Sequence, residues 1–189
     1  MILPESIPNF LSFQELNDRF NALTPSPKDV GTVDLICIRP TENSREVKDS
    51  VIVDNQLGII GDNWKSRGSK HTPDGSAIPD AQITIMNSRI INLITQDKNF
   101  WSLAGDQLFI DLDISSDNLP SGSRLTIDDV ILEVTPLPHN GCIKFSNRFG
   151  SDATKFVSNK EGQKYHRRGI YVKVIKSGRI HTGSIVKKL

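Results

Sequence analysis

Cysteine is scarce in this chain of 189 residues, which contains only Cys37 and Cys142 and no CxxC motif. The scarcity argues against a disulfide framework or a thiol-rich zinc site and favours a reducing compartment. No apolar run is long enough to span a bilayer, and residues 1–10 lack the pattern of a secretory signal. The formal net charge of +1 gives no indication of nucleic acid or an anionic membrane as partner. We therefore expect a cytoplasmic protein with neither partner.

Several motifs that identify common enzyme classes are also missing. There is no glycine-rich phosphate loop and no GxGxxG, so nucleotide binding has no motif support. HExxH, GxSxG and clusters of histidine with acidic residues are absent, so a zinc or iron centre and a serine hydrolase are not indicated. No ferredoxin-type cysteine cluster, flavin motif or haem site occurs, so any electron donor would have to be a separate protein.

The N-terminal segment carries a helix signal. Ser12 and Glu15 have the spacing of a capping box, and Phe13, Leu16 and Phe20 follow on one helical face. Prolines at positions 25 and 27 then end the pattern. We predict an N-terminal helical appendage over residues 1–28 and a main domain over residues 29–189.

The rest of the chain has a mainly β pattern. Short segments rich in β-branched residues predict strands over residues 33–39, 51–53, 82–86, 108–114, 124–127 and 130–135, and a terminal hairpin of residues 170–175 and 179–186. Asn87 is placed to cap a helix after residues 82–86, although one helix across both segments also fits the pattern. A further short helix is expected over residues 152–158. The sum predicts a β-barrel or sandwich with helical additions.

Two basic segments have no clear structural role. Residues 61–79 form a long polar loop with Lys65, Arg67, Lys70 and His71, which either holds an anion or is a solvated surface loop. A second cluster could bind phosphate or carboxylate, or could simply be a solvated face; it consists of Lys160, Lys164, His166, Arg167 and Arg168.

The two cysteines have different surroundings in the sequence. Cys37 shares the alternation of Val33 and Leu35, which predicts a buried and inert thiol. Cys142 follows a flexible Asn140-Gly141 step after two prolines, which predicts a turn at a barrel rim near basic side chains. A thiolate there could bind a soft metal or carry sulfur. The alternative is a buried structural cysteine that precedes a strand with Ile143 and Phe145.

A family resemblance adds to this second interpretation. The blocks that carry it are residues 57–64 (LGIIGDNW), 82–87 (QITIMN), 103–108 (LAGDQL), 118–122 (NLPSG), 138–145 (PHNGCIKF), 148–153 (RFGSDA) and the Arg168-Gly169 pair. In this order and spacing, from about Val33 to the C-terminus, the chain resembles the MOSC domain family, and most closely its short stand-alone members. The family is named for the C-terminal domain of molybdenum cofactor sulfurases.

The resemblance implies a closed or partly open β-barrel related to the small domain of pyruvate kinase. It also implies that Cys142 occupies the signature cysteine position, as a ligand of molybdenum or a carrier of sulfur. A site for the molybdenum cofactor, molybdopterin, would then include His139, Asn140, Gly141, Lys144, Arg148, Arg168, Gly61, Asp62 and Gln82. Asn63-Trp64 replaces the Arg-His found in many members, so one cofactor-binding cation is missing. Pyridoxal phosphate, often mentioned with the family, belongs to the desulfurase domain of the sulfurases, which is too large for this chain.

Three functions follow from the resemblance. The first is a molybdenum-cofactor protein in which Cys142 ligates the metal or carries sulfur. The second is a non-catalytic sulfur-relay module that accepts a persulfide from a cysteine desulfurase. The third is a reductase of N-hydroxylated compounds that depends on a separate electron-donor protein. The sequence identifies neither a substrate nor an oligomeric state.

Overall fold

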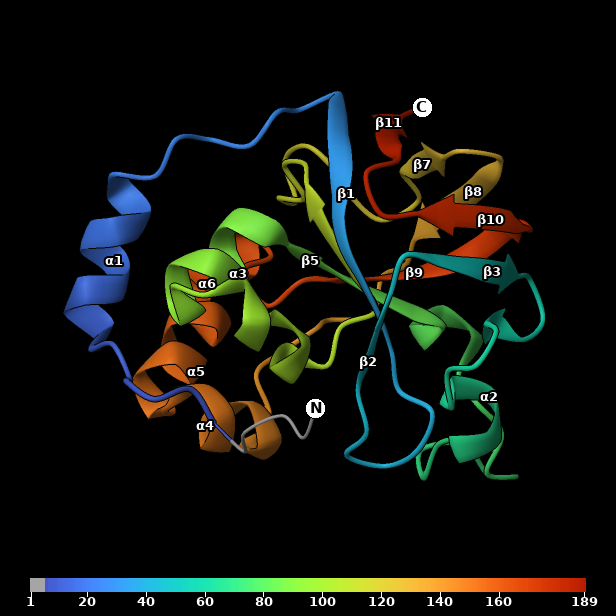
Figure 1. The fold of residues 1–189 in the computed structure, drawn as a ribbon, viewed down its shortest axis with the longest axis horizontal. Helices are drawn as coiled ribbons and strands as arrows, with labels where there is room; N and C mark the ends of the chain where they lie inside the picture. The colour runs from blue at the N-terminus through green and yellow to red at the C-terminus, as the bar shows by residue number, and fades with distance from the viewer. Residues whose placement is uncertain (1–5) are drawn as a thin grey trace.

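A closed β-barrel forms the centre of the molecule (Figure 1). The computed structural model describes residues 6–189, so the first five residues of the predicted appendage lie outside the described range. Strands follow the order β11-β7-β8-β9-β5-β6-β1-β2, and pairing of β11 with β1 closes a ring of seven strands that leaves β2 on the outside. The barrel prediction is therefore confirmed. The strands are β1 (Val30–Ile38), β2 (Glu46–Lys48), β5 (Ile83–Asn87), β6 (Leu108–Asp111), β7 (Arg124–Ile127), β8 (Val130–Val134), β9 (Ile170–Lys176) and β11 (Ile185–Lys188).

Aliphatic side chains fill the inside of the barrel. Alternation in β8 buries Val130, Leu132 and Val134, while the residues between them face outward. A smaller sheet with the order β10-β3-β4 packs beside this barrel core; it consists of β3 (Ser50–Asp54), β4 (Gly58–Ile59) and β10 (Gly178–His181). Its buried Val51 and Ile180 join the same core, which therefore extends beyond the ring.

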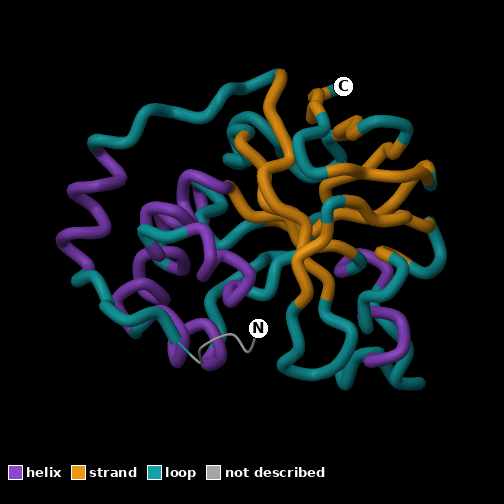
Figure 2. Tube along the Cα trace, viewed as in Figure 1, coloured by secondary structure: helices purple, strands orange, loops and turns teal. Residues whose placement is uncertain are grey.

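Helices cover one side of the barrel, as the purple segments of Figure 2 show. They are α1 (Phe13–Asn21), α3 (Ser88–Thr95), α4 (Ile143–Phe149), α5 (Ser151–Ser158) and α6 (Lys160–Lys164), together with the 3-10 helix η2 (Lys98–Ala104). The short α2 (Trp64–Arg67) and the 3-10 helix η1 (Pro79–Ala81) lie apart from this group. Over residues 6–189, none of the helices has the length and apolar character needed to cross a membrane.

An outer core lies between these helices and the outward faces of β1, β5 and β6. It consists of Ile7, Leu16, Leu35, Cys37, Met86, Ile90, Ile91, Leu93, Ile94, Trp101, Leu103, Ala104, Phe109, Phe145, Phe149, Ala153, Phe156 and Val157. The predicted common face of Val33, Leu35 and Cys37 is wrong in part. A register shift in β1 between Val33 and Leu35 turns Val33 into the barrel core, whereas Leu35 and Cys37 face the helices.

Local capping signals gave correct helix starts. Ser12 and Glu15 form the predicted capping box of α1, which ends at Asn21, before the prolines. The side chain of Asn87 accepts a hydrogen bond from the backbone of Ile90 at 3.0 Å, so β5 ends where α3 begins. The alternative of one continuous helix across residues 82–94 is wrong. The helix predicted over residues 152–158 is α5.

The predicted terminal hairpin is wrong. Strands β9 and β10 follow one another in the chain but do not pair; β9 pairs with β8 and β5, and β10 pairs with β3. The chain leaves the barrel at the Ser177-Gly178 step and re-enters it as β11. Tertiary pairing thereby overrides a local turn signal, because it buries Ile180 against Val51.

Candidate functional site

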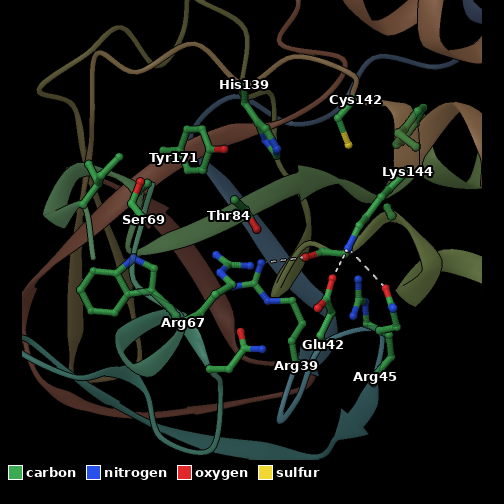
Figure 3. Close-up of a pocket in the computed structure, with 18 of the residues that line it drawn as sticks. Arg39, Glu42, Arg45, Arg67, Ser69, Thr84, His139, Cys142, Lys144 and Tyr171 are labelled. Carbon is green, nitrogen blue, oxygen red and sulfur yellow. Dashed lines mark hydrogen bonds and ion pairs between the residues drawn. The ribbon is translucent and has the colours of Figure 1, made fainter. Parts of the chain in front are cut away.

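A cavity of about 780 Å³ opens at one end of the barrel, between the β1–β2 connection, the loop around α2 and the segment that leads into α4 (Figure 3). We call it the rim cavity. Cys142, His139 and Tyr171 lie on one side of it in the close-up, and Arg39 and Arg67 lie on the other. Residues that are 100 positions apart in the sequence therefore meet in one space.

Six cationic side chains line the rim cavity; they are Arg39, Arg45, Arg67, Lys144, Arg148 and Arg168. Three are paired with carboxylates: Arg39 with Asp62, Lys144 with Glu42 and Arg168 with Asp106. Over residues 6–189, the other three have no carboxylate partner, so the wall carries a formal excess of three positive charges. This exceeds the net charge of +1 of the whole chain.

Arg39 is fixed by Asp62 in a two-point ion pair. Its Nε lies 2.9 Å from Oδ2 of Asp62, and its Nη2 lies 2.9 Å from Oδ1. Burial by itself raises the pKa of Asp62, but the hydrogen bonds from Arg39 and from the backbone of Trp64 outweigh it, so the pKa is lowered. Asp62 thus holds a cation in the wall rather than facing the cavity itself.

The guanidinium groups of Arg45, Arg148 and Arg168 are crowded. Burial lowers the pKa of Arg45, and the neighbouring charge of Arg148 lowers it further. Burial likewise lowers the pKa of Arg148, with Arg168 acting in the same direction and Cys142 in the opposite one. The Nε atoms of Arg45 and Arg168 are buried and donate to no described residue. Because arginine stays protonated in proteins, these groups repel one another, and a bound anion would relieve the repulsion.

Cys142 lies at the mouth of the cavity, directly before α4. Gly141 lets the chain approach α5 closely, since a Cβ at this position would lie 2.9 Å from side-chain atoms of Thr154 and Ser158. The Gly141 N–H donates to Oγ of Ser158 at 3.0 Å, which holds the segment against α5. Phe145 and Phe149 anchor α4 in the outer core, whereas Cys142 and Ile143 are exposed. The structure confirms the rim position of Cys142, and the alternative of a buried cysteine before a strand is wrong.

The second cysteine provides a contrast. Cys37 is fully buried in the outer core, and burial raises its thiol pKa to about 11. At neutral pH it stays protonated and is shielded from solvent. The predicted burial of this thiol is confirmed.

The predicted site residues separate into two groups. Cys142, His139, Lys144, Arg148 and Arg168 line the rim cavity. The remaining five do not line it: Asn140, Gly141, Gly61, Asp62 and Gln82. The Gln82 side chain is buried and links β9 to the turn between β3 and β4, because its Oε1 accepts from Val174 N at 2.7 Å and its Nε2 donates to Asn55 O at 3.0 Å. Gly141 contributes indirectly, because its close packing against α5 positions the neighbouring Cys142.

The two basic segments do not behave as solvated surfaces throughout. The loop over residues 61–79 contains α2 and brings Arg67 and His71 to the rim cavity. In the second cluster, Arg168 lines the cavity. Arg167 is fully buried between two aromatic rings, with its Cζ 3.9 Å from the ring centroid of Phe20 and 4.2 Å from that of Phe156. The surface interpretation is therefore wrong for Arg167 and Arg168, whereas Arg67 and His71 line the cavity with exposed side chains, and the lysines of both segments are exposed.

Sequence reasoning missed Arg39 and Arg45. Arg39 directly follows a buried strand and Arg45 precedes a short one, so both lie near strand ends at the same edge of the barrel. That position was the available signal. Together with Arg67, they bring positive charge to the region where the sequence lacks the cation expected near Asn63.

A metal ion would find few protein ligands here. Over residues 6–189, no group of three or more His, Cys, Asp or Glu side chains is arranged to hold one. A metal bound at Cys142 would therefore have to arrive with most of its other ligands.

Comparison with known proteins gives a family and a fold. A family model described as the MOSC domain matches residues 78–187. No curated protein matches the sequence. Among solved structures, YuaD from Bacillus subtilis has a TM-score of 0.65 at 17% identity and covers 84% of this chain and 95% of its own. YiiM from Escherichia coli has a TM-score of 0.54 at 15% identity, covering 85% and 69%. YiiM from Geobacillus stearothermophilus has a TM-score of 0.51 at 15% identity, covering 87% and 74%.

Proposed function

The matched residues make up more than half of the chain, which therefore belongs to the MOSC domain family, and on this premise we propose that the rim cavity binds the molybdenum cofactor with Cys142 at the metal. The observation that carries the proposal is the meeting of an exposed thiol and six cations in one cavity. Composition gave no indication of this concentration of charge.

The residues present fit the cofactor in three respects. A cavity of about 780 Å³ is within the range of cofactor sites. The buried, unpartnered Nε atoms of Arg45 and Arg168 are suited to the oxygens of a terminal phosphate. Cys142 supplies a soft sulfur ligand, and within residues 6–189 it belongs to no group of three His, Cys, Asp or Glu side chains that could hold a metal, which suits a metal that is already held by the cofactor.

Each part of the chain then has a separate task. Arg45, Arg148 and Arg168 would hold the phosphate, and Lys144 would close the mouth through its 2.8 Å ion pair with Glu42. Cys142 would lie at the metal end. When bound, the cofactor supplies redox chemistry at molybdenum, while the protein orients it and restricts access of water.

Metal retention tests the proposal. Wild type and Cys142→Ala would be purified from a host that makes the cofactor, with Cys37→Ala as a matched control, and molybdenum would be measured by mass spectrometry and pterin by fluorescence. We expect wild type and Cys37→Ala to retain molybdenum and pterin. Cys142→Ala should retain at least about tenfold less molybdenum than wild type. Equal molybdenum in all three proteins would rule out the ligand role.

A second candidate is sulfur relay. The exposure of Cys142 beside Ile143, which is 74% exposed, supports it, because both side chains are accessible to a partner protein such as a cysteine desulfurase. Incubation with a desulfurase and labelled cysteine, followed by peptide mass spectrometry, should place a persulfide on Cys142 and not on Cys37. An unmodified Cys142 under conditions that label a known acceptor would contradict the relay.

Reduction of N-hydroxylated compounds stays a prediction from the family resemblance. It would require an electron-donor protein, and a screen of cofactor-loaded protein with an artificial donor and hydroxylamine-type substrates would test it.

A further inference from the structure

Two buried polar atoms face each other behind the wall of the rim cavity without a hydrogen-bond partner in the described part of the chain. They are Nδ1 of His139 and Oδ1 of Asp106, 3.8 Å apart. The Asp106 side chain is fully buried and that of His139 is 8% exposed. Buried polar atoms are rarely left unpaired, so such a facing pair points to a function.

The imidazole is held firmly in this position. Its ring packs on Tyr171, with 4.5 Å between ring centroids. On another side it approaches Gly169, where φ is +107° and a Cβ would lie 3.3 Å from Nδ1 of His139. The remaining charged groups that face it are Arg168 and Arg39. His139 also lines the rim cavity (Figure 3). Its Nε2 is neither hydrogen-bonded to a described residue nor among the buried unpartnered atoms, so Nε2 is the end that meets the cavity.

The neighbouring charges decide the protonation of this pair. Nη1 of Arg168 donates to Oδ2 of Asp106 at 2.6 Å, and a buried guanidinium needs a charged partner, so Asp106 is a carboxylate although burial raises its pKa. Burial and the charges of Arg168 and Arg39 hold the pKa of His139 well below its ordinary value, so the imidazole is neutral. A neutral ring has one N–H, and the carboxylate attracts it to Nδ1.

We propose that Asp106 and His139 form a dyad that fixes the neutral Nδ1–H tautomer and makes Nε2 a hydrogen-bond acceptor in the rim cavity, which selects ligands with an N–H or O–H donor. Asp106 is a positioning residue in this dyad, because it acts only through the ring. The ligand-selecting part rests on the proposed cofactor site, since the pterin ring system presents N–H donors; the tautomer does not depend on it.

The tautomer can be read in the ligand-free protein by ¹⁵N-histidine NMR between pH 6 and 8. His166 is an internal reference, because its Nδ1 lies 2.6 Å from the carbonyl oxygen of Ile114 and must carry the proton to bond it. We expect His139 to show the same Nδ1–H signature in wild type and to lose it in Asp106→Asn. A wild-type His139 protonated on Nε2 would overturn the proposal even if Asp106→Asn fails to fold.

Ligand selection is tested by two substitutions at His139. Glutamine places an amide oxygen near the position of Nε2, whereas phenylalanine keeps a planar ring and removes the acceptor. With molybdopterin as the probe, we expect His139→Phe to bind about tenfold more weakly and His139→Gln to stay within about threefold of wild type, in keeping with one hydrogen bond.

The outcomes separate the two proposals. Equal affinity of wild type and His139→Phe would contradict the selecting role of Nε2 while leaving the cofactor site intact. Absence of binding by wild type would contradict the cofactor site, and the selecting role with it, whereas the NMR result would still decide the tautomer.

Discussion

Cys37 and Cys142 are residues of the same type in two different regions, one buried and one exposed. Cys37 lies in the outer core between β1 and the helices, where burial raises its pKa to about 11. Cys142 lies at the mouth of the rim cavity, exposed and among cationic side chains. The difference teaches that the chemistry available to a thiol is set by its burial and neighbours, which the residue type does not reveal.

The two regions should therefore respond differently to substitution. In the outer core, a change should reduce the free energy of unfolding, because packed apolar surface is lost. At the exposed mouth of the cavity, a change should leave the fold intact and affect ligand binding. The expected effect on stability therefore decreases from the outer core to the exposed mouth of the cavity.

Truncation in the outer core should have the largest effect. Phe156 is fully buried and packs against Phe20, with 6.0 Å between ring centroids, and against Arg167. Phe156→Ala should lower the free energy of unfolding by about 3–5 kcal/mol through lost burial and a cavity. Urea denaturation measures this, with the exposed Ile143→Ala as a control that stays within about 0.5 kcal/mol. A loss under about 1 kcal/mol for Phe156→Ala would contradict the expected difference between the outer core and the cavity mouth.

The ion pair between Arg39 and Asp62 tests where the expected difference between core and cavity ends, because this pair belongs to the cavity wall but is buried. Asp62→Asn leaves Arg39 without its carboxylate and should cost about 3 kcal/mol at pH 7. The folded-state pKa of Asp62 is lowered from 3.8, so its contribution is present above pH 3.8 and is lost as pH falls through the folded value. Wild type and variant should converge in acid.

The matched control for this pair is Asp117→Asn, which removes an exposed partner of Lys164 and should change stability by less than about 1 kcal/mol. Unfolding curves at several pH values would record both variants. A difference between wild type and Asp62→Asn that is constant from pH 7 to pH 2 would contradict the assigned role of this carboxylate.

Cys37 should make the fold sensitive to alkali. Its pKa is raised from 9.0 to about 11, so the folded state keeps a proton that the unfolded state releases. Stability should fall as pH rises above 9, by about 2–3 kcal/mol at pH 11. Unfolding measured from pH 8 to pH 11 should show this component in wild type and Cys142→Ala but not in Cys37→Ala. Identical slopes in all three proteins would show that Cys37 is not buried as described.

The smallest effect is expected at the other cysteine. Cys142→Ala removes an exposed side chain without a hydrogen bond to a described residue, so the free energy of unfolding should change by no more than about 0.5 kcal/mol. Thermal unfolding would measure it. A loss above about 1 kcal/mol would mean that Cys142 supports the fold, and the comparison of the two regions would lose its basis.

Much of the fold was predictable because its signals are local. The capping box at Ser12, the cap at Asn87 and the alternation in β8 each specify an element within a few residues. The terminal hairpin failed because strand pairing depends on distant partners. In the site, Cys142 was found through its motif, whereas Arg39 and Arg45 were missed because only barrel closure brings them to it.

Protection of Cys142 from alkylation tests the central claim most directly. Wild type would be treated with iodoacetamide with and without saturating molybdopterin, and both cysteines would be followed by peptide mass spectrometry. We predict that free protein is modified at Cys142 and not at Cys37, and that bound cofactor slows the Cys142 reaction at least about tenfold. An unchanged Cys142 rate with cofactor demonstrably bound would contradict the account, because the cofactor would then lie away from the thiol.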